Sequence, residues 1–161
     1  MGRRSAGVSP YIEDVERMFL GQHEHVVDDK GRLMVPARFR ELLGSNGYIT
    51  LGFDQNLMVL PAEVFERLAE HARTMSLTDP NARLLKRLLF SHAERVDIDR
   101  VGRILIPQWL RKDAEIANRA MVVGMGDYFE IWSYERWEEH RQLLQDSEAN
   151  AQRFASLELS L

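Results

Sequence analysis

Arg32 and Arg103 are the residues of this chain whose surroundings most suggest a chemical task. Each directly follows a glycine in the pattern Asp-x-x-Gly-Arg, which occurs at Asp28 to Arg32 and again, roughly seventy positions later, at Asp99 to Arg103. In both places three apolar residues and a proline come next. Arginine carries a planar fork of N–H donors that suits phosphate oxygens and the O6 and N7 atoms of guanine. Two such arginines in matching surroundings indicate contact with nucleic acid.

A plain turn explains part of this pattern. An aspartate side chain accepts backbone N–H groups and glycine adopts the left-handed conformation, so Asp28, Gly31, Asp99 and Gly102 are expected to shape two turns. In a single copy, the arginine would be interpreted as a solvated strand residue. A turn has no need of arginine after its glycine, however, and the repetition favours a binding role.

The repeat extends beyond the turns. Arg40 and Arg111 match at the same offset, and Ile49 to Gly52 aligns with Met121 to Gly124 at an offset one residue longer. A match of this length indicates an internal duplication. Two quasi-equivalent arginines on one body would suit a repeated or pseudo-symmetric target.

Other basic residues lie near both turns. Aspartates dilute these clusters, and a run of charges is usually a solvated face, so the motif carries the hypothesis rather than the charge. Arg83, Lys86 and Arg87 share one face of an expected helix and are interpreted as solubilising residues. The predicted DNA-binding residues are Lys30, Arg32, Arg38, Arg40, Arg100 and Arg103.

The sequence lacks the residues that several other kinds of chemistry require. The chain has no cysteine, which excludes thiol catalysis, cysteine-ligated zinc and iron–sulfur clusters. His23 and His25 lie on one face of an expected strand, but no third metal ligand follows at a recognisable spacing. A hydrolase using Asp28 or Asp99 as its base would lack a nucleophile or metal partner. We therefore expect no enzyme activity, metal, cofactor or small-molecule substrate.

The composition is that of an ordinary globular protein. The 161 residues are 45% hydrophobic and 29% charged, with a net charge of −4. A nucleic-acid contact must therefore come from a local basic patch rather than from the total charge. No apolar run approaches the roughly 18 residues of a membrane span, and no signal peptide precedes the first apolar segment. We expect a cytoplasmic protein with no membrane partner.

Hydrophobic periodicity and the Pro and Gly positions predict the local elements. Strands at 23–27 and 32–35 are expected to form a hairpin around the first turn, and strands at 48–53 and 57–60 follow. Helices are expected from Pro36 to Leu43, from Pro61, and from Pro80 to about Ser91. The last of these has Asp79 as its N-cap and a buried stripe of Leu84, Leu85, Leu88 and Leu89.

The second half is expected to repeat this plan from Arg95 to Trp137. A final helix would begin at Ser133 as its N-cap and run on past Leu144. The aromatic side chains in apolar positions are interpreted as core rather than as base-stacking platforms, and the tryptophans among them are Trp109, Trp132 and Trp137.

The duplicated motif, preceded by Met18-Phe19-Leu20-Gly21, resembles the MraZ family of bacterial transcriptional regulators. The resemblance implies an α+β fold: a pseudo-two-fold double-split (swapped-hairpin) β-barrel built from two AbrB-like halves, with flanking helices. It also implies homo-oligomeric rings that bind double-stranded DNA at short tandem direct repeats. These repeats would lie upstream of the cell-division and cell-wall gene cluster that includes the protein's own gene, which implies association with the nucleoid.

The second copy departs from the first, because Arg100-Val101 occupies the place of Asp29-Lys30. The two turns are thus not expected to contribute equally. The alternative function is a structural or protein-interaction oligomer with no direct DNA role. The expected organisation is a flexible extension at 1–17, a first half at 18–63, a helical connection at 64–92, a second half at 93–136, and a C-terminal helix with an acidic tail at 137–161.

Overall fold

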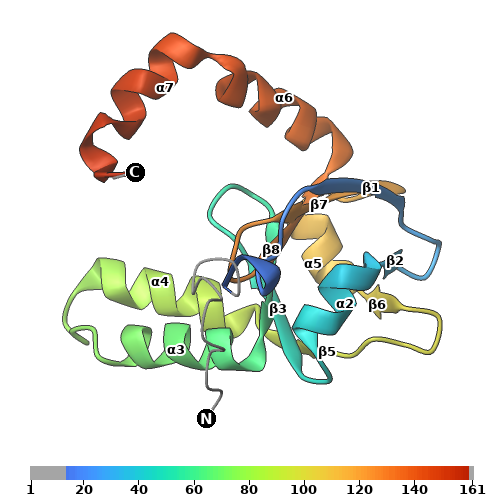
Figure 1. The fold of residues 1–161 in the computed structure, drawn as a ribbon. Helices are drawn as coiled ribbons and strands as arrows, with labels where there is room; N and C mark the ends of the chain where they lie inside the picture. The colour runs from blue at the N-terminus through green and yellow to red at the C-terminus, as the bar shows by residue number, and fades with distance from the viewer. Residues whose placement is uncertain (1–13, 160–161) are drawn as a thin grey trace, which may run out of the picture.

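The computed structural model describes residues 14–159, which form one α+β body with two antiparallel sheets (Figure 1). Residues 1–13 of the predicted extension lie outside the described part. The strands are β1 (Gln22–Val26), β2 (Arg32–Met34), β3 (Gly47–Leu51), β4 (Leu57–Pro61), β5 (Glu94–Val96), β6 (Arg103–Leu105), β7 (Arg119–Gly124) and β8 (Phe129–Ser133). The helices are α2 (Ala37–Leu43), α3 (Ala62–Arg73), α4 (Pro80–Ser91), α5 (Gln108–Asp113), α6 (Tyr134–Gln145) and α7 (Ser147–Phe154), followed by the short 3₁₀ helix η1 (Ala155–Leu157).

The larger sheet mixes strands from the two halves in the order β1-β7-β8-β4-β3-β5. β1 of the first half pairs with β7 of the second, and β5 of the second half pairs with β3 of the first. β4 and β8 pair at the centre. Exchanging each strand for its repeat counterpart reverses the order onto itself, so a pseudo-two-fold axis passes between β4 and β8. Within residues 14–159, β1 and β5 form the two edges and the six strands do not close into a barrel.

The smaller sheet lies on the same pseudo-two-fold axis. β2 pairs with β6, and the central pair of this ladder is Leu33 opposite Ile104, which are equivalent positions of the repeat. Both side chains are fully buried. Because each of these strands directly follows a Gly-Arg turn, their pairing brings the two turns into one region.

Aromatic rings fill the centre of the core. The ring centroids of Phe19, Phe39 and Phe129 lie 5.1–5.4 Å apart. Each of these side chains is almost fully buried, which stabilises the fold by roughly 1.5–3 kcal/mol per side chain. Phe39 is on α2, which runs from the first turn's strand, so the core holds that helix in place.

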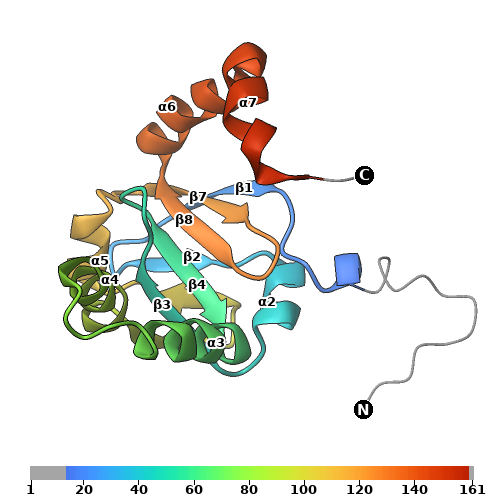
Figure 2. The same cartoon turned by 90° about the vertical axis from the view of Figure 1, so that its left-hand side faces the viewer.

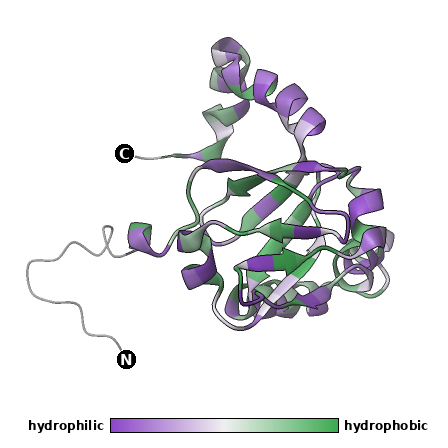
Figure 3. Cartoon of the chain, turned by 90° about the vertical axis from the view of Figure 1, so that its right-hand side faces the viewer, coloured by the Kyte–Doolittle hydropathy of each residue, from purple (hydrophilic) through white to green (hydrophobic). Residues whose placement is uncertain are grey.

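Helices lie on two sides of the sheet (Figure 2). α3 and α4 pack below it, and α6 and α7 rise from its other side. In Figure 3 these last two helices are largely in the hydrophilic colour, whereas much of the sheet is in the hydrophobic colour. None of the helices in residues 14–159 is both long and apolar enough to cross a membrane.

Most of the expected elements are confirmed. α4 begins where predicted, and the Asp79 carboxylate accepts the Asn81 backbone N–H at 2.9 Å. α6 begins after Ser133, whose hydroxyl accepts the Arg136 backbone N–H at 3.1 Å. Trp132 and Trp137 are buried, as expected for core residues.

Three local expectations are wrong. β1 and β2 do not form a hairpin ladder and meet only at the isolated bridge between Val27 and Leu33, because each pairs with a strand of the other half. Leu84 is exposed, since it lies about 100° around the helix from Leu85. Trp109 is 39% exposed on α5. The final helix α6 runs to Gln145, just past Leu144 as expected, and Asp146 then caps the separate helix α7 by accepting the Ala149 N–H.

Candidate nucleic-acid interface

The first turn is closed by the carboxylate of Asp28. Its Oδ1 accepts the backbone N–H groups of Lys30 at 3.0 Å and Arg32 at 2.9 Å. Its Oδ2 accepts the side-chain Nε–H of Arg32 at 2.7 Å. Gly31 has a φ of +85°, in the left-handed region that glycine favours. One aspartate therefore shapes the turn and orients its arginine at the same time.

The second turn repeats this geometry. Asp99 Oδ1 accepts the backbone N–H groups of Val101, Gly102 and Arg103 at 2.9–3.0 Å. Asp99 Oδ2 accepts the Nε–H of Arg103 at 2.9 Å, and Gly102 has a φ of +99°. In both turns the carboxylate accepts the Nε–H of its arginine, which directs the edge formed by Nη1 and Nη2 away from that carboxylate, although Arg103 Nη1 also lies near Asp28.

The two arginines belong to a single site. Arg103 Nη1 lies 3.8 Å from Asp28 Oδ2, the atom that already holds Arg32. The side chains of Arg32 and Arg103 are 35% and 28% exposed, so solvent or a ligand can reach them. In Figure 1 both turns extend on the side of the molecule where β2 and β6 lie, away from α3 and α4.

The other predicted DNA-binding residues have different surroundings. Lys30, Arg38 and Arg100 are exposed, and Arg38 forms an exposed ion pair with Glu41 at 3.1 Å. Arg40 is half-buried and donates from Nη1 to the carbonyl oxygen of Val101 in the second turn, at 3.5 Å. The structure therefore places Arg40 against the opposite half, which its position in the sequence did not indicate.

Sequence reasoning left Arg111 out of the site. It is equivalent to Arg40, is half-buried, and donates from Nε to the carbonyl oxygen of Ile106 at 3.0 Å. A Cβ on Gly31 would lie only 2.6 Å from the Arg111 guanidinium carbon. The matching offset of Arg40 and Arg111 was the available signal, although their contacts with the turns are visible only in three dimensions.

Hydrogen bonds keep both turn aspartates ionised. The Arg32 backbone N–H, assisted by the Arg32 side chain, lowers the pKa of Asp28. The Arg103 backbone N–H and side chain lower the pKa of Asp99 in the same way. These two carboxylates offset part of the positive charge, so the site relies on arranged donors rather than on a large excess of charge.

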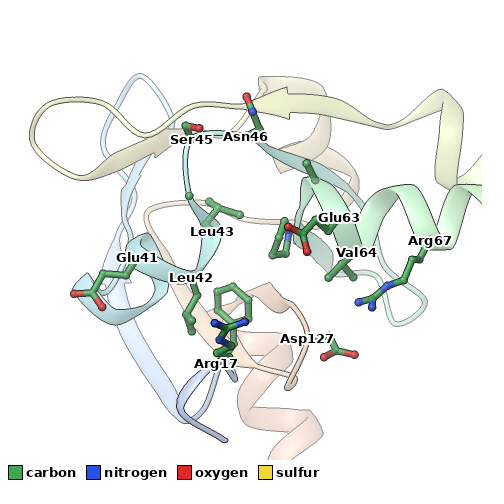
Figure 4. Close-up of a pocket in the computed structure, with 14 residues that line it drawn as sticks. Arg17, Glu41, Leu42, Leu43, Ser45, Asn46, Glu63, Val64, Arg67 and Asp127 are labelled. Atoms are coloured by element: carbon green, nitrogen blue, oxygen red, sulfur yellow. The ribbon is translucent and has the colours of Figure 1, made fainter. Parts of the chain in front are cut away.

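A cavity lies away from the turns (Figure 4). This cavity of about 560 Å³ is lined by residues of both charges, and the described residues around it include none of the six predicted to bind DNA. Its charged side chains are Arg17, Glu41, Glu63, Arg67 and Asp127.

The two histidines expected on one strand, His23 and His25, lie on β1 beside the protein core. The His23 ring lies 5.4 Å from the Phe39 ring in an edge-on contact. Burial, followed by the nearby His23, lowers the pKa of His25. Within residues 14–159, no three His, Asp or Glu side chains gather as a metal site would require.

Fold and site together define an internally duplicated α+β protein whose halves each contribute one Asp-x-x-Gly-Arg turn to a shared basic site. A family model described as "MraZ protein, putative antitoxin-like" matches the chain twice, over residues 18–88 and 89–157. The chain belongs to the MraZ family, a family of transcriptional regulators rather than of enzymes.

Relatives named "Transcriptional regulator MraZ" support this assignment over most of the chain. The protein from Roseiflexus castenholzii is 47% identical over 86% of this chain and 94% of its own length. The protein from Thermomicrobium roseum is 45% identical over 87% of this chain and 99% of its own length. The protein from Herpetosiphon aurantiacus is 48% identical over 75% of this chain and 85% of its own length.

Proposed function

We propose that this chain regulates transcription by binding short tandem direct repeats in double-stranded DNA through its two Asp-x-x-Gly-Arg turns. The observation that carries the proposal is the shared site, in which Arg32 and Arg103 are each held at Nε by a carboxylate. The Nη1 and Nη2 edge of each guanidinium matches the geometry needed for a bidentate contact with guanine O6 and N7, and at Arg103 such a contact would replace the 3.8 Å contact between Nη1 and Asp28. Two such side chains held side by side would contact neighbouring bases.

The basic residues divide into two proposed roles. Arg32 and Arg103 contact base edges, and each contact supplies roughly 1–3 kcal/mol of discrimination. Contacts with phosphates fix the register of a protein on the duplex without specifying sequence. We assign these contacts to the surrounding basic side chains, which are Lys30, Arg38, Arg40 and Arg100.

We extend the proposal to the wider setting that the resemblance to the MraZ family implies. The site offers few contacts per chain, so a ring of several copies on several repeats would gain about 10²- to 10⁴-fold through effective concentration. The exchange of β1 and β5 between the halves supports a double-split, swapped-hairpin topology, although the six strands of the larger sheet stay open within residues 14–159. The target repeats would lie upstream of the cell-division and cell-wall genes, including the protein's own gene, in the nucleoid.

Fluorescence anisotropy with labelled upstream DNA tests the binding itself. The wild-type protein should prefer the repeat DNA over a shuffled duplex of the same composition. The double variant Arg32→Ala/Arg103→Ala should lose this preference while its thermal unfolding stays close to that of the wild type. Arg73→Ala is the matched control, because it removes an exposed arginine on α3. Equal binding of both duplexes by the wild type would contradict the proposal and favour the alternative of a protein-interaction oligomer.

Salt dependence tests the contribution of several copies. The slope of log K against log salt is about −0.9 for each phosphate neutralised on B-DNA. With duplexes of one to four repeats, the slope should steepen as repeats are added, because each added chain releases its own counterions. Light scattering supplies the assembly mass. The same slope on all four duplexes, or a monomeric protein, would rule out the multivalent mechanism.

A further inference from the structure

Each turn is hydrogen-bonded to the opposite half of the molecule. The carbonyl oxygen of Gly31 accepts the backbone N–H of Ile106 at 2.9 Å, and that of Gly102 accepts the N–H of Val35 at 3.0 Å. Val35 and Ile106 follow the short strands β2 and β6. The backbone of one half therefore reaches the glycine of the other.

An arginine from the opposite half covers each glycine. The guanidinium of Arg111 occupies the space that a Cβ on Gly31 would need, with Cζ and Nε both 2.6 Å from the ideal Cβ position. The guanidinium of Arg40 occupies the corresponding space at Gly102, where Nη1 would be the nearest atom. Arg40 also donates to the adjoining Val101 carbonyl, whereas Arg111 donates to Ile106, the residue bonded to Gly31.

Short helices anchor both arginines. Arg40 lies on α2 directly after the buried Phe39, and Arg111 lies on α5 directly after the buried Leu110. Each helix holds its arginine on the core, and the long side chain extends to the other half's turn. A planar guanidinium can lie flat over a glycine peptide and still donate to a carbonyl, which a lysine ammonium cannot do.

We propose that Arg40 and Arg111 are reciprocal positioning residues, each holding the Gly-Arg turn of the opposite half in the shape that binds DNA. The inference rests on the proposed function and deepens it, because it couples the orientation of Arg32 to that of Arg103 across the pseudo-two-fold axis. Arg40 keeps Nη2 for the phosphate contact proposed above. Arg111 holds the first turn, a role that the distribution of basic residues in the sequence did not predict.

Hydrogen exchange of backbone amides tests the crosswise connection without DNA. Arg40→Lys and Arg111→Lys keep the charge and remove the planar guanidinium. Arg40→Lys should accelerate exchange of the second turn and Val35 roughly tenfold, and Arg111→Lys should do the same for the first turn and Ile106. Arg38→Lys on the exposed side of α2 is the control and should change neither turn. Faster exchange in the turn of the variant's own half, or uniformly along the chain, would overturn the proposal.

Arg40→Gln and Arg111→Gln form a second pair, which removes the guanidinium without leaving a flexible ammonium nearby. They must show the same crosswise pattern. A pair without it overturns the proposal, whatever the lysine variants show.

DNA binding supplies the second readout. The lysine variants should bind repeat DNA about five- to tenfold more weakly, with an unchanged salt slope and unchanged affinity for shuffled DNA, because they retain the charge. A residue that only contacts phosphate would instead tolerate lysine. If exchange becomes faster in the opposite turn but specific DNA binding is unaltered, the positioning role alone is overturned. A wild-type protein without preference for the repeats would overturn the proposed function, and the exchange pattern would still decide whether each arginine holds the opposite turn.

Discussion

The first and second turns share the atoms that hold them and differ in the residues that face outward. In both, an aspartate accepts backbone N–H groups and the Nε–H of the arginine, and a glycine has a positive φ. Between these residues, the first turn has Asp29 and Lys30, whereas the second has Arg100 and an exposed Val101. The comparison separates what builds the turn from what the turn can present to a ligand.

The aspartates also differ in their surroundings. Asp99 Oδ1 accepts three backbone N–H groups and Asp28 Oδ1 accepts two. Asp28 instead lies close to both arginines: its Oδ2 is 2.7 Å from Arg32 Nε and 3.8 Å from Arg103 Nη1. The second turn is held more by its own backbone, and the first holds the two halves of the site together.

The largest expected effect comes from removing one arginine at a time. Arg32→Ala and Arg103→Ala should each weaken specific DNA binding by roughly 1–3 kcal/mol, because each removes one base contact. Unfolding temperatures should change little, since both side chains lie at the surface in ion pairs that contribute little stability. Titrations of the same repeat duplex measure both losses. An affinity loss confined to one variant would mean that only one turn contacts bases.

Replacing the turn glycines should have the next largest effect. An alanine in the left-handed region costs roughly 1–2 kcal/mol, and at Gly31 or Gly102 it must also displace an arginine. Gly126→Ala is the matched control, because Gly126 has a φ of +81° and open space around its ideal Cβ. Thermal melts should therefore show a greater loss for the two turn variants. Equal losses at all three glycines would show that the covering guanidinium moves aside freely.

Exchanging the outward residues should alter salt dependence more than stability. Lys30→Val should make the slope of log K against log salt shallower by about 0.9, and Val101→Lys should steepen it by about as much. Affinity measured at several salt concentrations on one repeat gives both slopes. Unchanged slopes would place the tips of the turns away from the phosphates.

The smallest effect concerns a difference inside the sheet, where Met58 and Glu130 are equivalent positions of the repeat and face each other across β4 and β8. Burial raises the pKa of Glu130, although the Trp132 Nε1–H donates to its carboxylate at 2.9 Å. The folded state thus holds this proton more tightly than the unfolded state. The resulting stability is complete below the unfolded pKa and is lost as the pH rises through the folded pKa.

Glu130→Gln should remove this pH dependence, because glutamine accepts the same Trp132 hydrogen bond without a charge. The wild type should lose unfolding temperature relative to the variant as the pH rises from about 4 towards neutrality. Parallel melts across that range provide the measurement. Parallel curves for the two proteins would show that the carboxylate reaches solvent in the folded state.

Local patterns predicted the elements and the turns because their causes are local. Proline at a helix start, an aspartate N-cap and a glycine after a turn act on residues a few positions away, as at Pro36, Asp79 and Gly31. The pairing of β1 with β7 joins residues about a hundred positions apart, and no periodicity within either strand specifies that partner. The contact of Arg111 with Gly31 also depends on the pairing of strands between the two halves. The repeat offset therefore identified Arg111, but it did not predict that contact.

The exchange of β1 also has a consequence for synthesis on the ribosome. Gln22 to Val26 emerge about a hundred residues before β7, so at about 5–20 residues per second β1 waits roughly 5–20 s for its partner. An unpaired strand of that kind can join a neighbouring chain instead. The strand's sequence, Gln-His-Glu-His-Val, is mainly polar and carries a charge at its middle. These residues should discourage such association until the nascent chain supplies Arg119 to Gly124.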